Sequence, residues 1–195
     1  MSISVYTYRM VEELQNLPDK LMYYLNNISN DYEKYIQSSE YEYSYYKERM
    51  GRYNAKKETS FKSLNTKNDI VMAHNKYLSK LPIKPDIIED IGKQIEDMFP
   101  GYNASNSGMH LYPSGGFLGW HTNSNAEYTR VYVSYSKQGN GYFKWLRNDL
   151  KGVSQDTKGW MMRVFDTSKP YLWHCVYTDE PRISIGYRLT ELNNN

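Results

Sequence analysis

The strongest constraint on this chain is a period-two alternation of apolar and polar residues that begins after Pro100. This is the period of β-strands, whose successive side chains point to opposite faces. The alternating segments are short and are separated by turns rich in Gly, Asn and Asp, such as Gln138-Gly139-Asn140-Gly141. Because no helical pattern separates them, they predict an antiparallel sandwich or barrel. The predicted strands are 107–113, 117–121, 128–136, 141–147, 160–167, 172–177 and 182–189.

The first hundred residues instead predict helices, at 9–27, at 29–50 and, most clearly, between Pro85 and Pro100. We expect these helices to brace the outer face of the sheet. The tyrosines of the second helix are expected to form its packed face, with substrate contact as the alternative. We therefore interpret 1–100 as a mainly helical N-terminal extension packed on the barrel. Residues 101–195 form the barrel core, and the whole chain is one structural domain.

The composition is that of an ordinary globular protein, with 39% hydrophobic and 24% charged residues among 195. No apolar run approaches the roughly 20 residues that span a bilayer, and the N-terminus lacks a secretory pattern. The single cysteine, Cys175, excludes an intramolecular disulfide, so the cytoplasm, or the host cytoplasm for a viral protein, is the expected compartment. A net charge of +2 neither requires nor excludes nucleic acid, and 21 tyrosines match the A/T-rich codon bias of a phage-like genome. The oligomeric state is not indicated.

The last predicted strand carries an unusual polar face. Arg182, Ser184 and Arg188 alternate with apolar residues and therefore share one side of the strand. The connection Thr178–Pro181 predicts a tight turn. A hairpin closed by this turn would place His174 opposite Arg182, with roughly 5 Å between their Cβ atoms. In a small barrel, such a mixed face can line a ligand cavity.

A buried arginine needs an anion, because an unpaired buried charge is costly. The planar guanidinium of Arg182 suits a carboxylate or a phosphate. A structural ion pair with Asp166 or Glu180 is the alternative, and the sequence does not decide between the two.

A second polar group lies on the predicted strand 117–121 and just beyond it. His121 and Asn123 are two residues apart on an extended segment, so their side chains reach the same side. A His-x-carboxylate pair combined with a distant histidine forms the facial triad of non-haem iron oxygenases, which leaves coordination positions open for co-substrate and oxygen. A single histidine is more often structural. The argument therefore depends on the joint order of the motifs.

That joint order resembles the iron(II)/2-oxoglutarate-dependent dioxygenase superfamily, and most closely its prolyl-hydroxylase and AlkB-like branches. The resemblance covers residues 108–189. It implies an α+β fold in which a double-stranded β-helix, a jelly-roll barrel, is preceded by helices that brace the sheet. The matching motifs are Tyr112–Phe117, His121-Thr122-Asn123, Gly141-Tyr142-Phe143, Gly159-Trp160 with Phe165, and His174 with Arg182-Ile183-Ser184.

The resemblance implies that His121 and His174 bind Fe(II) and act in catalysis. Asn123 stands where the family has a metal-binding carboxylate, and a neutral amide oxygen is a poorer donor to iron(II). Three outcomes stay open: Asn123 or a water fills the position with activity retained, a halide occupies it, or the metal site has decayed. Glu127 is the nearest carboxylate in the sequence and an alternative ligand.

The resemblance also implies a 2-oxoglutarate site. Arg182 would pair with the distal carboxylate of 2-oxoglutarate, assisted by the Ser184 hydroxyl, and Tyr112 would hydrogen-bond the co-substrate. Arg188 follows Arg182 as a second arginine does in AlkB-like proteins, and is expected to bind cofactor or to face iron or substrate. The family reaction uses O2 to decarboxylate 2-oxoglutarate to succinate and to hydroxylate a substrate.

Two functional hypotheses follow. The first is an Fe(II)/2-oxoglutarate-dependent dioxygenase that hydroxylates a substrate. The second is a catalytically inactive oxygenase-fold binding or structural protein, for instance a viral one. The substrate is undetermined between a peptide, a nucleobase and a small molecule. Trp120, Trp145 and Trp173 are expected either to rim its cavity or, more commonly for aromatic residues, to pack in the core.

Overall fold

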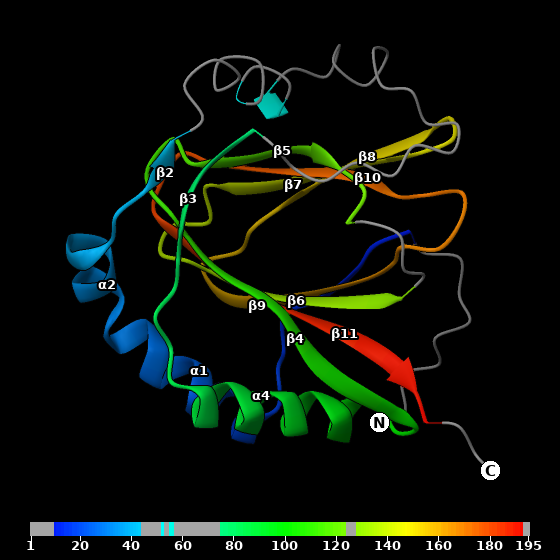
Figure 1. Ribbon diagram of the computed structural model, residues 1–195, viewed down its shortest axis with the longest axis horizontal. Helices are drawn as coiled ribbons and strands as arrows, with labels where there is room; N and C mark the ends of the chain where they lie inside the picture. Colours follow the sequence, from blue (N-terminus) through cyan, green and yellow to red (C-terminus); the bar gives the residue numbers. More distant parts are fainter. Residues whose placement is uncertain (1–9, 44–51, 53–54, 57–74, 124–127, 193–195) are drawn as a thin grey trace.

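Two antiparallel sheets face each other in this computed structural model, which describes residues 10–43, 52, 55–56, 75–123 and 128–192 (Figure 1). The lower sheet has the order β1-β9-β6-β11-β4, and the upper sheet has the order β5-β10-β7-β8. The lower strands are β1 (Glu12–Leu14), β9 (Gly159–Asp166), β6 (Thr129–Ser136), β11 (Arg182–Glu191) and β4 (Tyr102–Tyr112). The upper strands are β5 (Phe117–His121), β10 (Trp173–Thr178), β7 (Gly141–Arg147) and β8 (Leu150–Gln155).

One strand connects the two sheets. β3 (Lys76–Lys80) pairs with β4 of the lower sheet and with β5 of the upper sheet, and the short β2 (Glu42–Tyr43) pairs with β3. Figure 1 shows β3 running from one layer to the other along their shared side. The first hundred residues therefore contribute strands to the sheets as well as helices.

Helices cover the outer face of the lower sheet (Figure 1). They are α1 (Asp19–Asn30), α2 (Tyr32–Ser38) and α4 (Pro85–Met98). Ile91 and Ile95 of α4 are fully buried and pack in one core with Ile183 and Ile185 of β11. This arrangement confirms the predicted α+β fold, a double-stranded β-helix braced by N-terminal helices. No helix in the described part of the chain is long and apolar enough to cross a membrane.

The two earlier helices differ from expectation at their ends. The predicted helix 9–27 begins only at Asp19, directly after Pro18, and β1 occupies residues 12–14 instead. The predicted helix 29–50 is represented by α2, which ends at Ser38. Tyr32 at its start is buried in the core, as expected for a packed tyrosine face. The tyrosines at 45 and 46 lie outside the described residues.

The alternation along β11 separates the core from a polar interior. Ile183 and Ile185 face the helices, whereas Ser184 and Arg188 line a cavity between the sheets. Arg182 has the same parity and is buried on the same interior side. The prediction of a polar face on this strand is confirmed.

The predicted hairpin between the last two strands is wrong. β10 and β11 do not pair, because the segment between them crosses from the upper sheet to the lower sheet. His174 lies opposite His121 on β5 and Trp145 on β7. Arg182 lies opposite Tyr112 on β4. The turn chemistry indicated a tight connection, but it did not indicate which sheet each strand joins.

Candidate metal and co-substrate site

A cavity of about 360 Å³ lies between the two sheets. Its lining comes from both layers: His121 and His174 from β5 and β10 of the upper sheet, and Tyr132, Ser184 and Arg188 from β6 and β11 of the lower sheet. The structure therefore brings the two predicted iron ligands into one cavity with part of the predicted co-substrate site.

The two histidines form a close pair across neighbouring strands. Their ring centroids are 4.1 Å apart, and both side chains are buried. The Nδ1 atom of His121 lies 2.8 Å from the Gly119 carbonyl oxygen, and that of His174 lies 3.0 Å from the Leu172 carbonyl oxygen. A carbonyl only accepts, so Nδ1 carries the proton in both rings and each Nε2 keeps its lone pair. This is the tautomer of metal-ligating histidines.

Burial keeps both imidazoles neutral. It lowers the pKa of His121 from 6.5 to about 4, and it lowers the pKa of His174 well below its usual range, with further lowering from the neighbouring His121. The cationic Arg130 contributes in the same direction at both rings. Two neutral nitrogen donors are thus available at the usual pH of a cell.

Asn123 completes the group and is held in place by hydrogen bonds. Its Nδ2 donates to the Tyr132 hydroxyl at 2.7 Å and lies 3.0 Å from His174 Nε2. Its backbone φ is +62°, a left-handed conformation that asparagine tolerates better than most residues. In this orientation the amide offers N–H groups to the imidazole. Binding a cation would require the amide to rotate so that Oδ1 faces the nitrogens.

The donor set fits a metal ion only with Asn123 or an outside ligand included. Within the described residues, no three His, Cys, Asp or Glu side chains are grouped to hold a metal ion. Imidazole nitrogens suit iron(II), and an amide oxygen is a neutral third donor. Glu127, the alternative ligand, lies outside the described residues.

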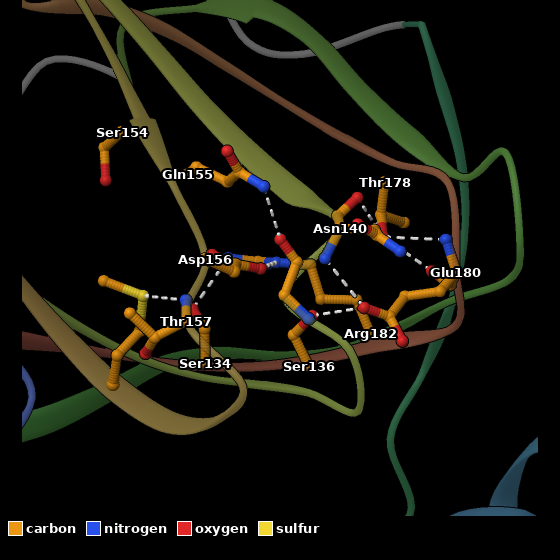
Figure 2. Close-up of polar contacts among 12 residues, drawn as sticks. Ser134, Ser136, Asn140, Ser154, Gln155, Asp156, Thr157, Thr178, Glu180 and Arg182 are labelled. Carbon is orange, nitrogen blue, oxygen red and sulfur yellow. Dashed lines mark hydrogen bonds and ion pairs between the residues drawn. The ribbon is translucent and has the colours of Figure 1, made fainter.

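Arg182 is the centre of a buried ionic network (Figure 2). Its Nε lies 2.6 Å from Asp156 Oδ2, and its Nη2 donates to Ser134 Oγ at 2.7 Å. Asp156 also accepts from Arg163 Nη1 at 2.7 Å. All three charged side chains are at most 2% exposed. The two carboxylates considered from the sequence act elsewhere: Asp166 pairs with an arginine of β7, and Glu180 accepts from turn amides.

Two buried guanidinium groups share the Asp156 carboxylate, and the exposed Glu13, the cross-strand neighbour of Arg163, also raises the pKa of that arginine. The Nη1 atom of Arg182 is buried and has no hydrogen-bond partner among the described residues. A buried donor without a partner is costly. The geometry therefore fits a further anion at this edge of Arg182, which is where the resemblance puts the distal carboxylate of 2-oxoglutarate.

The remaining predicted co-substrate residues line the cavity, whereas Arg182 itself is not among its lining residues. The Arg182 guanidinium lies 5.5 Å from the centroid of the Tyr112 ring, and Tyr112 and Ser184 both line the cavity. Burial raises the pKa of Tyr112, so its hydroxyl stays protonated and able to donate. Arg188 lies further along the same face of β11 and also lines the cavity.

Several cavity residues have no motif that identifies them. Arg130 and Tyr132 share the parity of the interior face on β6, so period two was the only sequence signal for them. His110 lines the cavity from β4, and burial lowers its pKa to about 4. The tryptophans are different, because Trp120 and Trp173 belong to a separate core cluster, in agreement with the core-packing alternative.

No family model and no curated protein matches the sequence, but solved structures share the fold. A prolyl hydroxylase from Trichoplax adhaerens, in complex with a peptide fragment of the hypoxia-inducible factor oxygen degradation domain, gives a TM-score of 0.51 at 11% identity. The match covers 94% of this chain and 84% of that one. OsALKBH1 gives a TM-score of 0.52 at 12% identity, covering 94% of this chain and 99% of that one. An oxidoreductase of the 2OG-Fe(II) oxygenase family from Burkholderia pseudomallei gives a TM-score of 0.44 at 12% identity, covering 92% of this chain and 94% of that one.

At 11 and 12% identity the likeness establishes architecture. The chain has the double-stranded β-helix fold of the prolyl-hydroxylase and AlkB-like 2-oxoglutarate–Fe(II) oxygenases.

Proposed function

We propose that this protein is an Fe(II)- and 2-oxoglutarate-dependent dioxygenase that hydroxylates a substrate bound in the cavity between its sheets. His121, His174 and Asn123 would hold the metal. Arg182 and Ser184 would hold the distal carboxylate of 2-oxoglutarate, and Tyr112 would hydrogen-bond the co-substrate. The observation that carries the proposal is the combination of two neutral imidazoles with a buried, unpartnered Arg182 Nη1. A purely structural barrel has no need for either group.

The protein's own residues orient and insulate the reaction. The Gly119 and Leu172 carbonyls fix the ring tautomers, so that the Nε2 atoms are donors without any proton loss. The Tyr132 hydroxyl accepts from Asn123 Nδ2, and after the amide rotation that metal binding requires it would instead donate to Oδ1 and hold that oxygen beside the metal. Iron and 2-oxoglutarate, when bound, would supply the oxidising chemistry. Because the described residues offer no carboxylate ligand at this position, the carboxylate of 2-oxoglutarate that is not paired with Arg182 would supply negative charge beside the metal.

A second candidate function is a binding protein with a decayed metal site. Two observations favour it: Asn123 presents N–H rather than oxygen to His174, and Asp156 already neutralises part of Arg182. Under this hypothesis the cavity binds an anionic ligand without turnover.

The deciding experiment is anaerobic reconstitution of the full chain with Fe(II) and 2-oxoglutarate. The proposal predicts a metal-to-ligand charge-transfer band in the visible range, and succinate after oxygen is admitted. The variants Asn123→Asp and Asn123→Ala are run in parallel. Retention of activity in wild type with a loss in Asn123→Ala supports the proposal. No band and no succinate in wild type, with both appearing in Asn123→Asp, would establish the decayed site instead.

A further inference from the structure

Two cavity arginines are not yet accounted for. Arg130 has no function in the site described above, and Arg188 has only the function that the resemblance implies. Arg130 on β6 and Arg188 on β11 are direct cross-strand neighbours, and both line the cavity. Their guanidinium carbons lie 5.8 and 5.5 Å from the centroid of the same ring, Tyr128. Like charges directly opposite each other on neighbouring strands destabilise a sheet. The pair therefore needs a compensating group.

The described residues do not supply that group. Neither arginine forms an ion pair within them, and residues 124–127 lie outside the described part of the chain. The hydrogen bond that Arg130 makes runs from Nη2 to the Asn123 carbonyl oxygen, at 3.4 Å. The Nε atoms of both arginines are buried and have no hydrogen-bond partner among the described residues. Arg130 as a whole is 6% exposed. Two unsatisfied guanidinium donors around one cavity form a site for an oxyanion.

The position of the pair distinguishes it from the Arg182 site. Burial decreases along β11, from Arg182 at 2% exposed, through Arg188, which is partly exposed, to the exposed Thr190. Arg182 and Arg188 are six residues apart on one face, which corresponds to about 20 Å between Cα atoms of an extended strand. The arginine pair thus lies toward the more exposed end of the cavity.

We propose that Arg130 and Arg188 together clamp the carboxylate or phosphate group of a small anionic ligand, which is the substrate if the proposed function holds. Arg130 is bonded to the Asn123 backbone and lines the same cavity as both histidines. A ligand anchored there extends its uncharged part toward His121 and His174. The cavity volume of about 360 Å³ favours a small molecule over a polymer.

The test is isothermal titration calorimetry of the full chain with inorganic phosphate and, separately, acetate. We expect wild type to bind at least one of them. Binding should weaken roughly tenfold or more in Arg130→Met and in Arg188→Met, the effect of removing a charge-assisted hydrogen bond. Arg188→Lys, which keeps the charge and loses the fork, should be intermediate. Lys93→Gln, at an exposed lysine of α4, removes the same charge elsewhere and should bind as wild type does.

Circular dichroism checks that each variant folds. If Arg130→Met is unfolded, the partly exposed Arg188→Met carries the test. The inference is overturned if wild type binds neither anion, or if Lys93→Gln weakens binding as much as the cavity variants do.

A second titration separates this site from the co-substrate site. Phosphate or acetate is added to protein saturated with 2-oxoglutarate, and the expected result is unchanged binding. If 2-oxoglutarate displaces the anion and Arg188→Met abolishes 2-oxoglutarate binding, the pair is a co-substrate subsite and the inference is wrong. If 2-oxoglutarate does not bind while the anion does, the proposed function fails and the clamp stands.

Discussion

The carboxylate of Asp156 and the guanidinium of Arg182 form a fully buried ion pair, with 2.6 Å between Oδ2 and Nε. Asp156 comes from the segment just after β8, and it reaches Arg182 only because Gly141 leaves room. A Cβ at Gly141 would meet Asp156 Oδ2 at 2.0 Å. The arginine that the family motif assigns to a co-substrate is therefore positioned by an internal carboxylate, which leaves its Nη1 edge for the proposed co-substrate contact.

Asp156→Asn should be strongly destabilising. It leaves Arg163 and Arg182 buried without a counter-ion, and breaking a buried pair in this way costs about 3–5 kcal/mol. Urea denaturation measures the loss. The matched control is Asp166→Asn. The Asp166 side chain is 46% exposed and pairs with Arg147, so this substitution should cost at most about 1 kcal/mol. Equal losses in the two variants would mean that the buried network contributes no special stability.

Gly186→Ala should weaken metal binding through Tyr132. A Cβ at Gly186 would lie 2.8 Å from Tyr132 Cε1, so the ring must move, and its hydroxyl restrains Asn123. We expect Co(II) affinity to fall by roughly tenfold, the size of effect seen when the support of a metal ligand is removed. Titration followed by the visible spectrum of Co(II) gives the affinity. Tyr132→Phe removes the hydroxyl without crowding and should reproduce the loss. An unchanged Co(II) affinity in both variants would show that metal binding does not depend on the Tyr132–Asn123 contact.

Stability should fall as the pH falls from about 6.5 to about 4. The pKa of His121 is lowered by burial from 6.5 to about 4, so over this range the unfolded chain binds a proton that the folded chain does not. Its contribution is complete above pH 6.5 and is lost on acidification, at a cost on the order of 3 kcal/mol. His174 acts in the same direction.

Denaturation at several pH values checks this. His121→Phe removes one titrating ring and should flatten the slope in this range. The arginine partners of the Asp156 carboxyl hold its pKa below 3.8, so the stabilisation that it provides is lost only below this pH range. A slope unchanged by the substitution would contradict the assignment to His121.

Glu180→Gln should loosen the connection between β6 and β7. The Glu180 carboxylate accepts from the Ser136 hydroxyl at 2.6 Å, and from the Gln138 and Asn140 amides at 3.0 and 2.8 Å (Figure 2). Replacing it with an amide leaves part-buried donors of this turn unsatisfied, at a cost of about 1–3 kcal/mol. Thermal denaturation measures the change. Glu33→Gln, at an exposed ion pair with Lys137, is the control and should change stability little.

Local periodicity predicted most of the barrel strands, because successive side chains of a strand point to opposite faces of the sheet. β5 and β7 begin and end at the predicted residues. β8 was not predicted, since Leu150 and Val153 are exposed and its pattern carries no clear apolar face. The pairing partners were not predictable either, because a short turn is compatible with a hairpin and with a crossing between sheets.

The candidate site was predictable where the motif consists of sequence neighbours or of a familiar order. His121, Asn123 and His174 share the cavity as the resemblance implied. Asp156 was missed because its partners, Arg163 and Arg182, lie on other strands, and the sequence around it is simply polar. A long-range ion pair of this kind leaves no local signal.

The opposed position of His121 and His174 also has a consequence for the lifetime of the protein. The two residues belong to neighbouring strands joined by a long intervening segment, so a ligand that binds both rings clips β5 to β10. Such a clip adds its binding free energy to the folded state alone. The loaded protein should then resist proteases for longer than the empty one, which makes the supply of the ligand a control on the amount of protein that survives.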